Sequence, residues 1–171
     1  LRFLYELAHV ARPKEIVGIG TYAGLALLAI SAGAVDGTQC GESQTFAMGI
    51  DIDSIGTALA SENSRLLELE PCVTFVCHDG FDFLQRRQTP IDLLFIDIDE
   101  PKIGKHRYAD VLLMALPKLC PNAIIIADDA YVLSFKRDLD RFRQQVKCQA
   151  ILTPPIDIPI DRSGLIVTQK R

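Results

Sequence analysis

Length, composition and charge limit the class of protein to which the chain can belong. It has 171 residues, enough for one domain, and 49% of them are hydrophobic, which excludes a disordered chain. Eighteen basic residues stand against 22 acidic ones, and this net charge of −4 lacks the excess of basic residues typical of proteins that bind nucleic acid or anionic membranes. No apolar run approaches the roughly 20 residues of a membrane-spanning helix. We expect a single domain over 1–171 with no nucleic-acid or membrane partner.

Short β-branched runs alternate with helix-length amphipathic segments along the chain. We expect strands at 15–20, 45–52, 72–77, 91–97, 123–127, 150–152 and 165–168. We expect helices around His9 and at 24–32, 54–67, 81–87, 108–119 and 137–146. Apolar strands that alternate with helices indicate an α/β fold, a doubly wound Rossmann-like sheet covered by helices on both faces. Such a sheet gathers the carboxyl ends of its strands at one edge, where ligands bind.

Two segments lack periodicity and are expected to be loops. Glycines and small polar residues run through 33–43, and Pro154, Pro155 and Pro159 interrupt the segment before the last strand.

A glycine-rich turn follows the first expected strand. Its cofactor candidates are Gly18, Gly20 and Gly24, because glycines let the backbone turn tightly and approach a ligand at the start of a helix. The spacing Gly18-x-Gly20-x-x-Ala23 also fits a dinucleotide-binding fingerprint. A turn that binds no ligand is the alternative.

Acidic residues follow the second and third expected strands. Asp51 is placed to accept hydrogen bonds from ribose hydroxyls, and Asp79 to meet an adenine amino group. Asp53 and Ser54 are natural caps of the helix that begins there, and Asp79 is equally suited to a turn or a cap.

Three further carboxylates follow the fourth and fifth expected strands. These strands are neighbours in a doubly wound sheet, so Asp97, Asp128 and Asp129 should converge. Carboxylates brought together need a cation or shared protons. Oxygen ligands favour Mg²⁺ or Ca²⁺, and the alternative is that these acids only form turns.

Five motifs together resemble those of class I S-adenosylmethionine-dependent O-methyltransferases, and the most similar branch is the cation-dependent catechol and caffeoyl-CoA group. The resemblance extends over about residues 4–170. The motifs are Val17-Gly-Ile-Gly-Thr-Tyr-Ala-Gly24, Gly49-Ile-Asp-Ile-Asp53, Phe95-Ile-Asp-Ile-Asp99, Ile124-Ile-Ile-Ala-Asp-Asp129 and Ser163-Gly-Leu-Ile-Val167.

The resemblance implies a seven-stranded sheet with an antiparallel last strand, and S-adenosylmethionine as cofactor. It places Gly20, Tyr22 and Gly24 at the methionine part, Asp51 at the ribose, and Ile52 and Asp79 at the adenine. The metal ligands that it implies are Asp97, which also borders the cofactor, Asp128 and Asp129. The metal would bind and acidify the acceptor hydroxyl.

The chain departs from the family pattern at several positions. Gly18 stands where the family has an acid, and Glu100 stands where it has the lysine that acts as general base. Glu100 itself, Lys102 or Lys105 could take that role, with His106 as a further candidate. The chain also has few of the N-terminal helices that help to build the acceptor pocket in the family.

The sequence therefore predicts methyl transfer to a hydroxyl of a small phenolic or vicinal-diol acceptor. Two alternatives remain open, which are an NAD-dependent oxidoreductase and a cofactor- or partner-binding domain without catalysis. Five irregularly spaced cysteines, with no CxxC pair, favour a cytoplasmic protein. A homodimer is compatible with the sequence.

Overall fold

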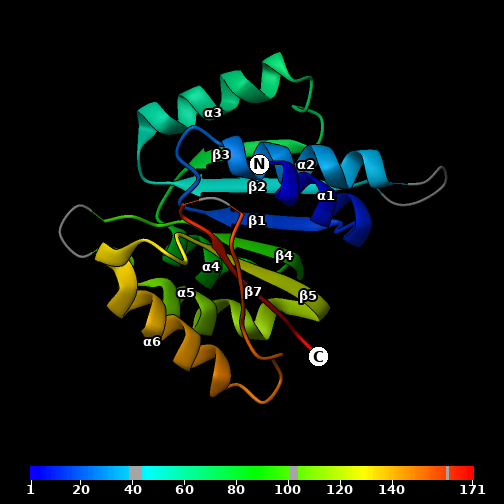
Figure 1. Cartoon of the computed structure of the whole chain (residues 1–171). Helices are drawn as coiled ribbons and strands as arrows, with labels where there is room; N and C mark the ends of the chain where they lie inside the picture. The colour runs from blue at the N-terminus through cyan, green and yellow to red at the C-terminus, as the bar shows by residue number, and fades with distance from the viewer. Residues whose placement is uncertain (39–43, 101–103, 161) are drawn as a thin grey trace.

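A seven-stranded sheet forms the centre of the computed structural model, which describes residues 1–38, 44–100, 104–160 and 162–171 (Figure 1). Its strands are β1 (Glu15–Ile19), β2 (Phe46–Asp51), β3 (Val73–Cys77), β4 (Ile91–Ile96), β5 (Leu119–Asp128), β6 (Ile156–Ile158) and β7 (Leu165–Gln169). They are arranged in the order β3-β2-β1-β4-β5-β7-β6. The first five strands are parallel, and β7 runs antiparallel to both β5 and β6. The predicted fold class and the antiparallel last strand are confirmed.

Helices cover both faces of this sheet. They are α1 (Arg2–Ala11), α2 (Leu25–Gly37), α3 (Ser54–Leu66), α4 (Gly80–Arg86), α5 (Tyr108–Ala115) and α6 (Lys136–Lys147). The first three lie on one side of the sheet and the last three on the other, as Figure 1 shows. Alternate residues of each strand point to opposite faces, so Ile16 joins the core under α1 and α2 while Val17 joins the core under α5 and α6. In the part of the chain that the structure describes, no helix combines the length and apolar character needed to cross a membrane.

The helix α2 extends into a segment that the sequence analysis predicted to be a loop. It continues to Gly37 because its glycines pack against the backbone of α1. A Cβ atom at Gly33 would lie 2.1 Å from the Tyr5 carbonyl oxygen, and one at Gly37 would lie 2.3 Å from the His9 carbonyl oxygen. These glycines therefore permit a close helix contact, whereas residues 39–43 lie outside the described part.

Two other predicted boundaries are wrong. The helix expected over 108–119 ends at Ala115, and a 3₁₀ turn containing Pro117 follows, since proline lacks the N–H that would continue the helix. The strand expected at 150–152 contributes a single bridge, from Leu152 to Lys170. The strand β6 forms instead in the proline-flanked segment, where it pairs only with β7 and needs no second ladder.

Candidate functional site

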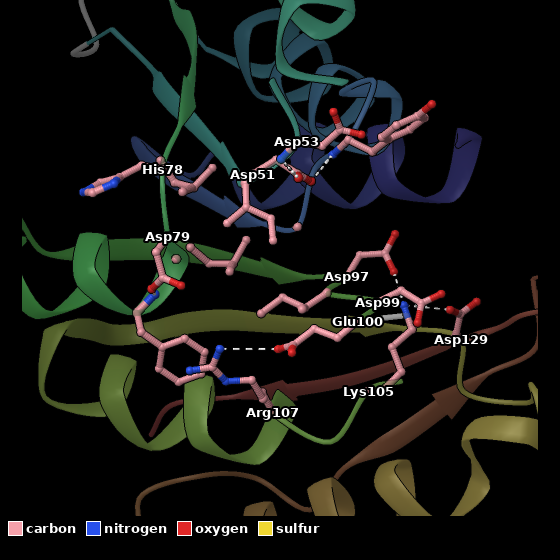
Figure 2. Close-up of a pocket in the computed structure, with 18 residues that line it drawn as sticks. Asp51, Asp53, His78, Asp79, Asp97, Asp99, Glu100, Lys105, Arg107 and Asp129 are labelled. Carbon is pink, nitrogen blue, oxygen red and sulfur yellow. Dashed lines mark hydrogen bonds and ion pairs between the residues drawn. The ribbon is translucent and has the colours of Figure 1, made fainter. Parts of the chain in front are cut away.

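A cavity of about 560 Å³ opens at the carboxyl-terminal edge of the sheet. Its walls come from the ends of β1 to β4 and from the segments that follow β1 to β5, as Figure 2 shows. Ligand-binding cavities measure about 300–1,000 Å³ and, in doubly wound sheets, lie at this edge. The cavity therefore has both the size and the position of a small-molecule site.

The turn after β1 places one of its predicted glycines against the cavity. Gly20 has a φ of 78°, and a Cβ atom there would lie 2.6 Å from the carbonyl oxygen of Asp97. No other residue fits this position, because a side chain would meet the backbone that follows β4. Gly20 thus lets the turn lie directly against the end of the neighbouring strand.

Gly18 and Gly24 do not line the cavity, which departs from the prediction that they contact a cofactor. Gly18 lies inside β1, where a Cβ atom would be 2.6 Å from Cγ2 of Thr21. Gly24 precedes α2, where a Cβ atom would be 2.6 Å from the Phe75 ring. Both glycines serve packing beneath the turn.

Asp51 fixes the wall of the cavity at the end of β2. Its Oδ2 accepts a hydrogen bond from the Tyr22 N–H at 2.7 Å, and its Oδ1 accepts one from the Asp53 N–H at 2.8 Å, as Figure 2 shows. Two backbone amides thereby hold the carboxylate without a cationic side chain. Tyr22, with a φ of 42°, and Ile52, which is 71% exposed, also line the cavity.

Two further acids at this end of the cavity are helix caps. Asp53 caps α3, since its Oδ1 accepts from the N–H groups of Ile55 at 2.9 Å and Gly56 at 3.2 Å. Asp79 caps α4 in the same way, through the N–H groups of Phe81 at 2.8 Å and Asp82 at 3.0 Å. The capping alternatives are confirmed, and both residues line the cavity as well.

The opposite end of the cavity holds a buried lysine between two carboxylates. Nζ of Lys105 lies 2.5 Å from Oδ1 of Asp97 and 2.9 Å from Oδ2 of Asp129, as Figure 2 shows. The Lys105 side chain is only 2% exposed. The Tyr108 hydroxyl adds a hydrogen bond to the same oxygen of Asp97 at 3.3 Å. The strand ends thus bring Asp97 and Asp129 together, as predicted, around an ammonium group.

The protonation of this cluster follows from burial and neighbouring charge. Burial raises the pKa of Asp97, although Lys105 opposes the rise. Burial alone would lower the pKa of Lys105, but Asp97 and Asp129 outweigh it and hold that pKa above its usual value. Burial, and then the charge of Asp97, raises the pKa of Asp128 to about 6. Lys105 is therefore a cation at neutral pH.

Asp128 lies close enough to Asp97 for that charge to raise its pKa, whereas the ion pairs of Lys105 are with Asp97 and Asp129. Its Oδ1 accepts the Asp129 N–H at 2.7 Å, and its side chain does not line the cavity. This local bond stabilises the turn after β5, where Asp129 has a φ of 65°. One carboxylate oxygen of Asp128 is therefore held by the backbone.

These residues do not fit the predicted Mg²⁺ or Ca²⁺ site. No group of three or more acids, histidines or cysteines among the described residues has the arrangement needed to hold a metal ion. The Lys105 ammonium occupies the space between Asp97 and Asp129, and one oxygen of Asp128 accepts from a backbone amide. The residues as they stand do not fit a metal bound by Asp97, Asp128 and Asp129, since that prediction took no account of a cationic side chain.

The four candidates for a general base have different outcomes, and His106, whose side chain is 53% exposed, does not line the cavity. Lys105 is charged and enclosed by two carboxylates, so it has no free lone pair to accept a proton. Glu100 lines the cavity and forms an ion pair with Arg107, with its Oε1 3.4 Å from Nη1. Lys102 lies outside the described residues.

The cavity also contains residues that the sequence analysis did not select. His78 and Asp99 line it beside the predicted acids. Arg107 contributes a cation, with its guanidinium 3.8 Å from the centre of the Phe81 ring. His78 and Asp99 flank predicted positions in the sequence, which is a usable signal, whereas the approach of Arg107 to Phe81 depends on how distant segments fold together.

Fold and site together define a doubly wound α/β protein with a ligand cavity bordered by strand-end carboxylates. Residues 17–130 match a family described as a methyltransferase domain. The chain belongs to this methyltransferase family. The resemblance inferred from its motifs is thereby confirmed, and the match favours methyl transfer over hydride transfer. A comparison with curated protein sequences gives no match.

Solved structures share the fold over nearly the whole chain. An O-methyltransferase from Bacillus cereus, in complex with S-adenosylhomocysteine, has a TM-score of 0.82 at 19% identity, covering 99% of this chain and 80% of that one. An O-methyltransferase from Streptomyces achromogenes involved in tomaymycin synthesis, in complex with S-adenosylmethionine, has a TM-score of 0.80 at 16% identity, covering 99% and 78%. A methyltransferase from Geobacter sulfurreducens has a TM-score of 0.77 at 23% identity, covering 99% and 77%.

Proposed function

We propose that the protein transfers a methyl group from S-adenosylmethionine to a hydroxyl oxygen of a small-molecule acceptor. The observation that carries this proposal is Asp51, whose carboxylate is held at the cavity wall by two backbone amides. An acid at the end of the second strand is suited to the ribose hydroxyls of an adenosine-containing ligand. The S-adenosylmethionine and S-adenosylhomocysteine complexes of similarly folded O-methyltransferases support the choice of ligand.

The cavity residues divide naturally between the parts of such a ligand. Asp51 would accept hydrogen bonds from the ribose, and Ile52 would cover the adenine with its exposed apolar side chain. Asp79 uses Oδ1 to cap α4, so its other oxygen can accept from the adenine amino group. Gly20 and Tyr22 would border the methionine part, next to Asp97.

The chemistry requires alignment and a proton acceptor. The bound cofactor supplies a sulfonium methyl, which passes to the acceptor oxygen as the S–CH₃ bond breaks, an O–CH₃ bond forms and sulfur keeps the electron pair. Asp97 and Asp129 line the cavity beside Lys105, and their carboxylate oxygens would orient the acceptor hydroxyl and receive its proton. The walls contribute mainly by holding the two reactants in line.

Divalent-metal assistance is not part of this proposal. The carboxylates that would ligate the ion hold Lys105 instead, so no step is assigned to a metal.

Calorimetric titration with S-adenosylhomocysteine tests the cofactor site. We expect Asp51→Asn to weaken binding by about 10- to 100-fold, since a hydrogen bond to a charged group contributes about 1.5–3 kcal/mol. Asp110→Asn is the matched control, because Asp110 is an exposed acid of α5 paired with Arg141. A wild-type protein that binds NAD but neither S-adenosylmethionine nor its product would overturn the proposal.

The acceptor class requires a transfer assay. Wild-type protein with methyl-labelled S-adenosylmethionine should label hydroxyl compounds from a panel of phenols, vicinal diols and simple alcohols. Transfer to amines or thiols, with none to any hydroxyl, would contradict the proposed acceptor chemistry.

A further inference from the structure

The buried ammonium of Lys105 has an unusual set of neighbours. Its two closest contacts are carboxylate oxygens of Asp97 and Asp129, from the segments after β4 and after β5. Its Nζ also lies 5.3 Å from the ring centres of both Tyr108 and Phe135. An ammonium group is favoured over aromatic faces, whereas Mg²⁺ and Ca²⁺ take oxygen ligands. The surroundings therefore suit an organic cation.

This ammonium and a divalent ion cannot share the same place. Mg²⁺ binds carboxylate oxygens at about 2.0–2.1 Å and Ca²⁺ at about 2.3–2.6 Å. The Lys105 nitrogen already lies 2.5 Å and 2.9 Å from the oxygens that such an ion would use. A bound ion would have to displace a side chain that is 2% exposed and packed against two rings.

We propose that Lys105 takes the place of a divalent cation in this chain. Its ammonium holds Asp97 and Asp129 together and excludes a metal from between them. The consequence for catalysis rests on the proposed function, in which methyl transfer then proceeds without a bound divalent metal.

The presence of the Lys105 ammonium in place of a metal ion also changes which acceptor compounds the cavity can hold. A metal can bind both oxygens of a vicinal diol at once, and this selects diols. The Lys105 ammonium donates to Asp97 and Asp129 and is only 2% exposed, so it offers no such pair of open positions. The acceptor is then held by the carboxylate oxygens that face the cavity, so a compound with a single hydroxyl meets the requirement as well as a diol does.

Binding of Mn²⁺, followed by electron paramagnetic resonance, tests the exclusion directly. We expect wild-type protein to leave millimolar Mn²⁺ free, and Lys105→Ala to bind one ion, because this variant vacates the space between the carboxylates. Lys136→Ala is the matched control, since Lys136 is an exposed lysine that pairs with Asp140. It should behave like the wild type.

Two results would overturn the inference. The first is binding of one Mn²⁺ by wild-type protein that Asp129→Asn abolishes. The second is a folded Lys105→Ala variant, checked by circular dichroism, that still leaves Mn²⁺ free. The wild-type measurement is decisive even where the variant fails to fold.

Parallel measurements separate this inference from the proposed function. Wild-type methyl transfer should change by less than about twofold after treatment with a chelator, which corresponds to less than about 0.4 kcal/mol. A tenfold loss of methyl transfer after chelation that Mg²⁺ restores would contradict replacement of the metal by Lys105. It would leave the proposed function, methyl transfer to a hydroxyl, supported. Failure to bind S-adenosylhomocysteine would instead refute the proposed function and leave the Mn²⁺ result standing.

Discussion

The two ends of the cavity satisfy their carboxylates in different ways. At the end formed by β2 and β3, Asp51 and Asp79 accept hydrogen bonds from backbone N–H groups two or three residues further along the chain, and Asp51 also accepts one from the turn after β1. At the end formed by β4 and β5, Asp97 and Asp129 share the side chain of Lys105. The first arrangement uses backbone donors, and the second uses a buried charge.

This difference predicts how strongly the removal of a side chain should affect each end of the cavity. A carboxylate held by amides needs no counter-ion, and it can still accept from a ligand because each carboxylate oxygen has more than one lone pair. A pair of buried carboxylates without a cation would repel each other, so the second end depends on one side chain. Removal of that side chain should therefore have a much larger effect than removal of any single acid at the first end.

The largest effect is expected for Lys105→Met. Loss of one partner of a buried ion pair costs about 3–5 kcal/mol, and we expect the lower part of this range because the Asp97 side chain remains 34% exposed. Urea unfolding at neutral pH measures the loss. The matched control Lys136→Met removes an exposed i,i+4 pair and should cost about 0.5 kcal/mol or less.

A second substitution shows whether charge is the cause. Adding Asp97→Asn to Lys105→Met removes one of the carboxylates left without a cation, so part of the stability should return. Equal destabilisation by Lys105→Met and Lys136→Met would mean that Lys105 does not hold this end together.

The sequence predicted the central strands of the sheet well because β1 and β4 are almost wholly apolar and the strands alternate with helices, whereas β6 was misplaced. Helix α2 is the instructive failure. Gly33 and Gly37 suggest a loop when considered alone, but they are four residues apart and face the backbone of α1. A pair of glycines can end a helix or let it pack closely against a second helix. Which of the two occurs depends on a segment that lies far away in the sequence.

The residues of the candidate site also fall into those that the sequence could predict and those that it could not. Asp51 and Asp79 were predictable because they lie at or just after the ends of strands, and their donors are close in the sequence or in the adjacent turn. The convergence of Asp97 with Asp129 followed from the order of the strands. The position of Lys105 did not, since no periodic pattern determines how the segment between β4 and α5 returns to the cavity.

A smaller change in the free energy of unfolding is expected from pH, because of the acids at the end of the cavity formed by β4 and β5. The pKa of Asp128 is about 6 in the folded chain and about 3.9 in an unfolded one. The folded chain therefore binds the extra proton between these values, so the free energy of unfolding should fall as pH rises through this window and level off above it. The raised pKa of Asp97 acts in the same direction.

The variant Asp128→Asn tests how much of this pH dependence of stability comes from Asp128. Its Oδ1 can still accept the Asp129 N–H, while the charge is removed. We expect the variant to be more stable than the wild type at about pH 7 by about 1–2 kcal/mol and nearly equal to it at about pH 4, as urea unfolding at both values would measure. A constant difference between the two proteins at every pH would exclude this charge as the cause.

The smallest effect is expected at the backbone-held end, for Asp79→Ala. The substitution removes the acceptor for the Phe81 and Asp82 N–H groups at the start of α4, and loss of such a cap costs about 0.5–2 kcal/mol. Asp79→Asn keeps an oxygen at the cap and should lose only a fraction of this stability, which urea unfolding of both variants would measure. Because no buried cation depends on Asp79, neither variant should approach the loss expected for Lys105→Met. If Asp79→Ala destabilised the protein as strongly as Lys105→Met, the two ends of the cavity would not differ in the way that their hydrogen-bond donors indicate.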